Sequence, residues 1–282
     1  MPRPSPAARE LVDRYSLALD VPPPRGAVGE RLGRGTGGAL EFEERRLYEP
    51  GDDVRRIDWA AYARTDQVYL RLYREEIAPR LELLLDDSRS VGHDPQKAQS
   101  MVDLALALAG CAVAADYRVK LVVLGERPRP LSIDELEGTG LAFEDSTPLA
   151  VGLRAARGLL GPGSVRLVLS DFLAPARAEE LVRGLASGAG RLALIQLQGG
   201  TDIEPEVGST ARLVDAETGD EIDLVLDART VATYQDRRRR LEEGLERECR
   251  RAGGVWASLD SRERLDDLAR GPLSRAGVLI PG

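Results

Sequence analysis

Short apolar runs alternate with helical patterns from Leu81 to the end of the chain. The runs LELLLD, RVKLVVLG, VRLVLSDF, RLALIQLQ and GVWASLD have the length and composition of strands, and the first is apolar enough to be buried on both faces. Between them lie segments of helical length, the longest over residues 229–252. Strands that alternate with helices predict a mostly parallel, doubly wound α/β sheet of the Rossmann-like kind.

The first part of the chain has a different pattern. A short helix is expected around residues 8–19, followed by a stretch rich in Pro, Gly and Arg up to residue 40. The segments ALEFEERRLY and VYLRLYREE alternate between apolar and polar residues, which predicts two strands. We therefore predict a β-rich N-terminal extension over residues 1–78 and an α/β domain over residues 79–282. A hairpin with its turn at Thr218–Gly219 is expected inside that domain.

Composition narrows the possible functions. The chain has 282 residues and a net charge of -8, which argues against bulk nucleic-acid binding. Its two cysteines have no metal-type spacing, so a reducing compartment is expected. The N-terminal segment lacks the apolar core of a signal peptide. The longest apolar run, Leu104–Ala115, is shorter than the roughly 20 residues that span a bilayer. We therefore expect a cytoplasmic protein without a membrane span.

Polar residues gather where the predicted strands end. Asp86, Ser88 and Ser90 follow the first buried strand, Thr147 precedes a helix, and Asp171 ends the strand VRLVLS. Ligands of open α/β sheets bind at the carboxyl ends of strands. Hydroxyls and carboxylates without His or Cys suit Mg²⁺, Mn²⁺ or Ca²⁺ better than Zn²⁺. Each residue alone could be a helix cap or a turn former, but the combined pattern favours a metal site.

Other chemistries fit these residues less well. A phosphatase of the haloacid-dehalogenase type needs a second Asp two positions after Asp86, where Ser88 stands. A serine nucleophile needs a base, and no elbow motif accompanies the one histidine, His93. The glycines of Gly33–Gly38 neither follow a predicted strand nor open a helix, and the chain has no P-loop motif.

The D-x-S-x-S, Thr and Asp series resembles the metal-ion-dependent adhesion site of von Willebrand factor A domains. The run YEPGDDVRRIDW, inside Arg45–Glu76, resembles the signature of bacterial proteins in the domain of unknown function 58 family. The resemblance covers about residues 29–270 and implies a von Willebrand A-like domain after the signature. The sequence SDF replaces the usual T-D-G after the third strand, so Phe172 stands in place of Gly.

The resemblance also implies roles for the metal-site residues. Ser88 and Ser90 would bind the ion directly, Thr147 directly or through water, and Asp86 and Asp171 mainly through waters. One coordination position would stay open for an acidic side chain of a protein partner. Family resemblance further implies that this partner is a MoxR-type AAA+ ATPase.

We therefore expect a metal-dependent interaction adaptor or co-chaperone, not an enzyme. The ion expected first is Mg²⁺, with Mn²⁺ and Ca²⁺ as alternatives. The competing hypothesis is a metal-dependent hydrolase that uses the same cluster, with Glu144 and Asp145 as the nearest candidates for a general base.

Two charge-dense segments leave alternatives open. The paired charges and apolar anchors of Arg45–Glu76 can lock this segment onto the sheet domain, or form a docking surface with Arg–carboxylate forks. The run DRRRRLEEGLERECRR, Asp236–Arg251, predicts a solvated amphipathic helix.

Overall fold

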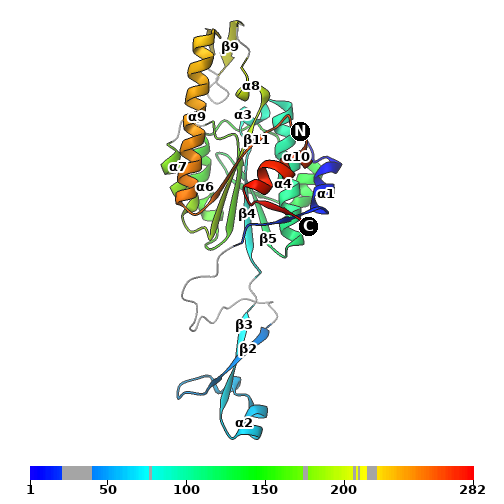
Figure 1. Cartoon of the computed structure of the whole chain (residues 1–282), viewed down its shortest axis with the longest axis vertical. Coiled ribbons are helices and arrows are strands. Elements are labelled where there is room, and N and C mark those ends of the chain that lie inside the picture. Colours follow the sequence, from blue (N-terminus) through cyan, green and yellow to red (C-terminus); the bar gives the residue numbers. More distant parts are fainter. Residues whose placement is uncertain (21–39, 76–77, 174–176, 206–207, 209, 215–220) are drawn as a thin grey trace. The chain divides into compact units, whose positions relative to one another are not determined.

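The computed structural model describes residues 1–20, 40–75, 78–173, 177–205, 208, 210–214 and 221–282 (Figure 1). The chain divides into two compact units. The sheet unit contains Met1–Pro22 and Pro79–Gly282, and the small unit is Pro23–Ala78. The glycines Gly33–Gly38 and the turn at Thr218–Gly219, both considered above, lie outside the described residues.

Six strands form the central sheet of the sheet unit: β4 (Arg80–Asp86), β5 (Arg118–Leu124), β6 (Arg129–Leu131), β7 (Val165–Ser170), β8 (Arg191–Gln198) and β11 (Val255–Asp260). Their order across the sheet is β11-β8-β7-β4-β5-β6. Neighbouring strands are parallel except for β6, which pairs with β5 in the antiparallel sense. The four central parallel strands are apolar runs, as expected for strands covered on both faces.

Helices cover both faces of this sheet (Figure 1). One face is covered by α1 (Pro6–Val12), α4 (Pro95–Ala114), α5 (Ile133–Thr139) and α10 (Leu265–Leu268), and the other by α6 (Leu149–Ala156), α7 (Ala178–Ala186) and α9 (Ala228–Arg251). Successive strand residues serve opposite faces, so Leu83 and Leu85 pack with α4 while Leu84 packs with α6 and α7. The predicted doubly wound α/β fold is confirmed.

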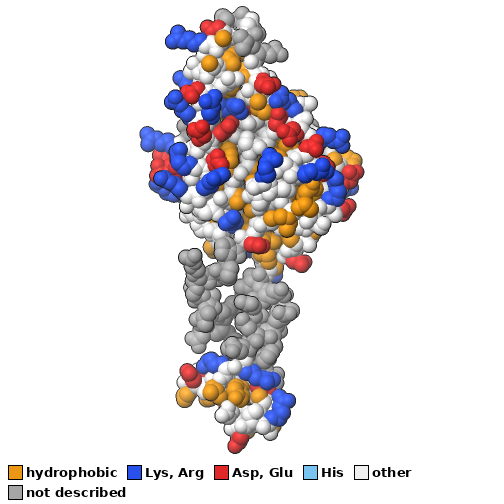
Figure 2. Space-filling view, viewed as in Figure 1, with side chains coloured by type: hydrophobic (Ala, Val, Ile, Leu, Met, Phe, Trp, Pro, Cys, Tyr) orange, Lys and Arg blue, Asp and Glu red, His pale blue; other side chains and the backbone are white. Residues whose placement is uncertain are grey.

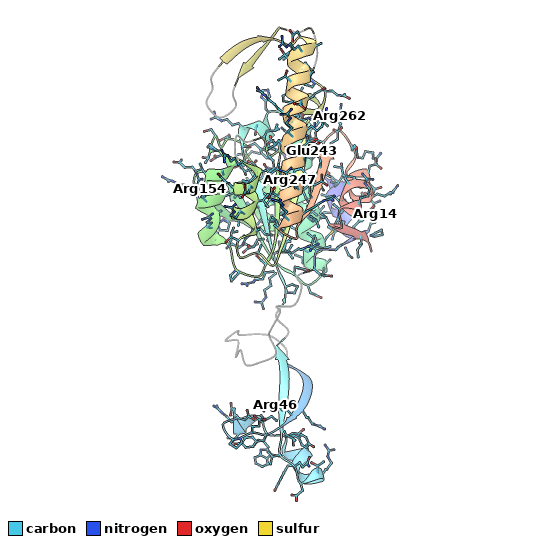
Figure 3. The ribbon with its side chains drawn as sticks, turned by 60° about the vertical axis from the view of Figure 1, so that its left-hand side comes forward. Arg14, Arg46, Arg154, Glu243, Arg247 and Arg262 are labelled. Atoms are coloured by element: carbon cyan, nitrogen blue, oxygen red, sulfur yellow. The ribbon has the colours of Figure 1, made fainter. Side chains whose placement is uncertain are left out.

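Short elements complete the sheet unit: β1 (Tyr15–Leu17), α3 (Arg89–Gly92), η2 (Arg157–Leu159), α8 (Gly200–Ile203), β9 (Thr210–Val214), β10 (Glu221–Val225), the π-helical turn η3 (Ala269–Leu273) and β12 (Leu279–Pro281). The antiparallel pair β9–β10 is the expected hairpin. The hairpin and the N-terminal part of α9 project together beyond the body of the sheet unit (Figures 1 and 3).

The N-terminal residues differ from the predicted extension over 1–78. The first helix begins at Pro6 and ends at Val12, and β1 then pairs with β12 at the other end of the chain. Ala8 and Leu11 are buried in the core that α4 shares with the sheet. Residues 1–22 therefore belong to the sheet unit, because their strand partner lies far away in sequence.

The helix α4 is longer than the apolar run that signalled it. It spans 20 residues, and it alone among the described helices is long and apolar enough to cross a membrane. In the structure it packs between the sheet and α1, and 72% of its apolar window is buried within the protein. Asp94 caps its N-terminus by accepting hydrogen bonds from the backbone N–H groups of Gln96 and Lys97, and Pro95 begins the first turn.

The small unit is an antiparallel pair with two helical turns. Its elements are β2 (Leu40–Leu47), η1 (Val54–Arg56), α2 (Trp59–Thr65) and β3 (Tyr69–Glu75). Hydrophobic side chains gather on its surface between basic ones (Figure 2), and Trp59 is 65% exposed. The signature charges pair within the unit, as in the bonds between Arg45 and Asp58 and between Arg46 and Asp52.

Replacement of Asp58 by alanine is expected to destabilise the small unit by about 1–2 kcal/mol. Asp58 is 1% exposed, and its carboxylate accepts from Ala61 N at 3.1 Å and from Arg45 Nε at 2.9 Å. The change removes both the helix cap and the ion pair. Hydrogen exchange of the α2 amides measures the effect. Asp58→Asn serves as the control, because asparagine keeps the cap and loses only the charge. Unchanged hydrogen exchange of the α2 amides in Asp58→Ala would contradict the stabilising role assigned to the Asp58 carboxylate.

Candidate metal site

The candidate site lies at the topological switch point of the sheet. Among the six strands, β4 comes first along the chain and β7 fourth, yet they are neighbours. From β4 the chain continues through α4 to β5 on one side, and from β7 through α7 to β8 on the other. A crevice forms outside the carboxyl ends of two such strands. Asp86 is the last residue of β4, and Asp171 follows β7 directly.

Asp86 is a buried carboxylate with a raised pKa. It is 5% exposed, and it accepts hydrogen bonds from Ser88 N at 3.1 Å and from Ser170 Oγ at 2.5 Å. Burial, and after it the nearby charge of Asp171, raises the pKa of Asp86 to about 6 against the lowering effect of these bonds. Two buried carboxylates in mutual repulsion favour a cation between or beside them.

The hydroxyls of Ser88 and Ser90 lie next to each other after the end of β4. Their Oγ atoms lie 2.9 Å apart. Adjacent ligands of an octahedral Mg²⁺ with bonds of about 2.0–2.1 Å are separated by about the same distance. Ser88 occupies the N-cap position of α3, but its side chain makes no capping hydrogen bond. The alternative interpretation of Ser88 as an ordinary helix cap therefore finds no support.

Thr147 is brought to this edge by the loop before α6. Residue Asp145 forms a β-bridge with Ser88, and its carbonyl accepts from Arg89 N at 2.9 Å. Thr147 N donates to Asp145 Oδ1 at 2.6 Å, and Glu126 N donates to Oδ2 at 3.2 Å. Burial raises the pKa of Asp145, but the bonds from Thr147 and Glu126 outweigh it and leave the pKa below its usual value. Pro148 occupies the N-cap position of helix α6, so Thr147 is not its N-cap residue.

A lysine that the sequence reasoning passed over lies inside the site. Lys97 belongs to the first turn of α4 and is 2% exposed. Its Nζ lies 3.1 Å from Asp171 Oδ2 and 3.0 Å from Asp202 Oδ2. Asp171 also accepts from Leu173 N at 3.1 Å through Oδ1. One feature of the sequence could have pointed to Lys97: a helix that follows the Asp86 loop must place its first turn near the ends of the strands.

In each of two loops beside the site, a phenylalanine has a positive φ, a backbone conformation that glycine adopts more easily than other residues. Phe172 has a φ of 53° and Phe143 a φ of 55°, a conformation that costs energy for residues other than glycine. The ring of Phe172 is 1% exposed and lies 5.8 Å from the ring of Trp256. Phe143 N donates to Asp87 Oδ1 at 2.7 Å, which gives Asp87 a positioning role that its sequence context did not reveal. At position 172, where the resemblance noted above has glycine, phenylalanine thus adopts a backbone conformation that glycine adopts at lower cost.

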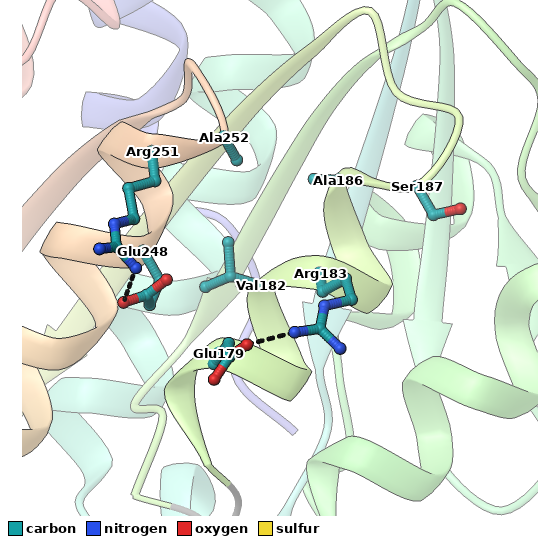
Figure 4. A pocket seen from close by; sticks show the side chains of 8 residues that line it. All are labelled: Glu179, Val182, Arg183, Ala186, Ser187, Glu248, Arg251 and Ala252. Carbon is teal, nitrogen blue, oxygen red and sulfur yellow. Dashed lines mark hydrogen bonds and ion pairs between the residues drawn. The ribbon is translucent and has the colours of Figure 1, made fainter.

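Within the described ranges, no three His, Cys, Asp or Glu side chains gather as a metal-binding group, so a metal here depends on hydroxyl ligands and water. A hollow of about 470 Å³ lies elsewhere, between α7 and the C-terminal part of α9 (Figure 4). Its charges are paired, Glu179 with Arg183 and Glu248 with Arg251. His93, near the site in sequence, is exposed.

The chain is a doubly wound α/β protein that carries carboxylate and hydroxyl oxygens at the switch point of its sheet. The chain belongs to the family described as "Protein of unknown function DUF58", which matches residues 44–244. It is 30% identical over 211 residues to the uncharacterized proteins Rv1480 of Mycobacterium tuberculosis strain H37Rv and Mb1516 of Mycobacterium bovis. The matched region is 68% of this chain and 65% of each relative, so the chain spans about two thirds of these relatives.

Solved structures with some likeness are more distant. BatB from Bacteroides thetaiotaomicron is 14% identical with a TM-score of 0.37, over 64% of this chain and 90% of BatB. Proximal thread matrix protein 1 of the mussel byssus, in a structure titled as having a zinc-occupied MIDAS motif, is 15% identical with a TM-score of 0.32, over 43% and 38% of the two chains. An aerotolerance-related membrane protein from Bacteroides fragilis is 15% identical with a TM-score of 0.31, over 60% and 99%.

These comparisons correct one expectation. The prediction of a protein without a membrane span is contradicted, since two of the similar structures are titled a membrane protein and a membrane spanning protein. The comparisons do not show a MoxR-type ATPase partner. By length and hydropathy α4 passes the test for a spanning helix, but 72% of its apolar window is buried inside the sheet unit, as in a core helix.

Proposed function

We propose that this protein is a von Willebrand A-like interaction adaptor or co-chaperone that binds a partner's acidic side chain through a divalent ion. The ion would be held by Asp86, Ser88, Ser90, Thr147 and Asp171, with Mg²⁺ as the first candidate and Mn²⁺ or Ca²⁺ as alternatives. The observation that carries the proposal is the pair of hydroxyls 2.9 Å apart beside two buried carboxylates at the switch point.

The two kinds of oxygen in the site have different tasks. The hydroxyls of Ser88 and Ser90 bond to each other, and both remain available as direct, neutral ligands. The carboxylates of Asp86 and Asp171 already accept hydrogen bonds from the protein, which suits them to hold ordered waters around the ion. When bound, the ion supplies a positive position at the surface that attracts a carboxylate from outside, because its direct protein ligands are neutral.

No observation favours the hydrolase alternative. Asp145 was a candidate base, but both of its oxygens accept backbone hydrogen bonds from Thr147 and Glu126. Glu144 is exposed, and its carbonyl accepts from Arg89 Nε at 3.1 Å. Neither carboxylate is presented to the Ser88 and Ser90 hydroxyls by a contact in the structure.

Titration of Mn²⁺ by electron paramagnetic resonance tests the proposed site. The protein is expected to bind one Mn²⁺, and Asp86→Ala combined with Ser88→Ala is expected to lower the affinity at least a hundredfold, because a buried carboxylate and a direct ligand are lost. Ser132→Ala is the matched control. Ser132 caps α5 by accepting from Glu135 N, so its loss affects that helix and not the ion.

Acetate then probes the open position as a stand-in for the partner's side chain. Proton relaxation of water on the bound Mn²⁺ is expected to fall as acetate replaces one water. Mn²⁺ binding that survives the double substitution, or no Mn²⁺ binding at all, contradicts the proposed site. Relaxation that is insensitive to acetate contradicts the bridging role.

A further inference from the structure

Lys97 is a fixed positive charge behind the proposed ion position. Its ammonium is enclosed, with a side chain 3% exposed, and it contacts one carboxylate of the site and one carboxylate outside it. Asp202 belongs to α8, directly after β8, and its Oδ2 also accepts from Gly199 N at 2.7 Å. Tyr234 of α9 donates to the carbonyl of Asp202 at 3.0 Å, which ties α8 to the projecting helix.

The described charged residues nearest to Lys97 are engaged elsewhere. Arg262, at the same edge of the sheet, is engaged with Asp260 at 2.8 Å and Glu204 at 3.1 Å (Figure 3). Asp94 accepts hydrogen bonds from the first N–H groups of α4, where the helix N-terminus already stabilises a negative charge. Lys97 therefore balances Asp171 and Asp202.

The charges around the proposed ion can be counted from these contacts. Asp86, Asp171 and Asp202 supply three negative charges, and Lys97 cancels one of them. Two negative charges remain, which a divalent ion neutralises. Without the ammonium, three carboxylates would act on the ion and leave the site with a net negative charge, which attracts an outside carboxylate less strongly than a neutral site does.

We propose that Lys97 tunes the site by cancelling the charge of Asp202 and part of that of Asp171, so that the divalent ion is held less tightly and stays receptive to the partner's carboxylate. This inference rests on the proposed function. Lys97 acts as a positioning and specificity-determining residue, since it touches the carboxylates and not the ion. Its removal must strengthen ion binding and weaken binding of an outside carboxylate, two effects of opposite sign.

A charge cycle measured with Mn²⁺ and acetate tests this inference. Lys97→Gln is expected to bind Mn²⁺ at least tenfold more tightly and to bind acetate at the loaded site at least threefold more weakly. Asp202→Asn is expected to weaken Mn²⁺ binding several-fold, because one carboxylate is lost. Combining Lys97→Gln with Asp202→Asn restores the net charge around the ion. The affinity of this double variant for Mn²⁺ is expected to return to within about threefold of that of the unaltered protein. Lys120→Gln is the control, since Lys120 donates to the Leu159 carbonyl at the other end of the sheet.

The outcomes separate this inference from the proposed function. Lys97→Gln with unchanged or weaker Mn²⁺ binding overturns the role of Lys97 alone, provided that the unaltered protein binds Mn²⁺. If the Lys97→Gln variant binds Mn²⁺ and the unaltered protein does not, the role of Lys97 is supported. The same result overturns the proposed function. If Lys97→Gln folds poorly, its melting temperature is measured with and without Mn²⁺. Mn²⁺ is expected to raise the melting temperature of Lys97→Gln by more than it raises that of the unaltered protein. Equal increases overturn the inference.

Discussion

Replacement of Arg166 by methionine is expected to lower the free energy of unfolding of the sheet unit by about 3–5 kcal/mol. Arg166 on β7 and Glu82 on β4 are cross-strand neighbours, 2% and 5% exposed. The guanidinium contacts Glu82 at 3.3 Å and also donates to the carbonyls of Leu185 and Ser187 at 2.5 and 3.0 Å. Methionine fills much of the volume but leaves a buried carboxylate without its counter-charge.

Urea unfolding followed by circular dichroism measures this loss. Arg183→Met is the control, because Arg183 pairs with Glu179 on the surface and is expected to change stability by less than about 0.5 kcal/mol. The double variant Glu82→Gln with Arg166→Met is expected to recover part of the loss, since the uncompensated charge is gone. Equal losses in Arg166→Met and Arg183→Met would refute the importance of the buried pair.

Replacement of Phe172 by alanine is expected to cost about 3–5 kcal/mol. The ring is buried in the core between the sheet and helices α6, α7 and α9, and it lies against Trp256. Alanine removes that packing and keeps a side chain on a backbone with a φ of 53°. Phe172→Gly loses the same ring but relieves the backbone, so it is expected to be more stable than Phe172→Ala by about 1 kcal/mol.

The same urea experiment tests this ordering. Val151→Ala on α6 is the control for a partly exposed apolar residue, with an expected loss below about 1 kcal/mol. A glycine variant no more stable than the alanine variant would contradict the strain assigned to Phe172. A loss in Phe172→Ala as small as that in Val151→Ala would contradict its role in the core.

Without any structure, the apolar runs of the chain predict the class of fold and the ends of the strands. Short apolar runs identified β4, β5, β7 and β8, since a strand covered on both faces is apolar at most of its positions. The residues Asp86, Ser88 and Asp171 were visible because a polar residue directly after such a run lies at the sheet edge. The ion, the roles of its ligands and the cytoplasmic location stay predictions.

The contacts between residues far apart in the sequence could not be predicted and became visible in the folded chain. Lys97 and Asp171 are 74 positions apart, and nothing in the helical pattern of α4 shows that its first turn faces β7. The pairing of β1 with β12, and of Glu82 with Arg166, depends on strand order, which local patterns do not encode. The resemblance placed Phe172 where glycine is usual, but only the structure shows that its backbone lies in the left-handed region, with a φ of 53°. Local periodicity specifies which face of an element is buried, whereas its neighbour is selected by packing across the whole sheet.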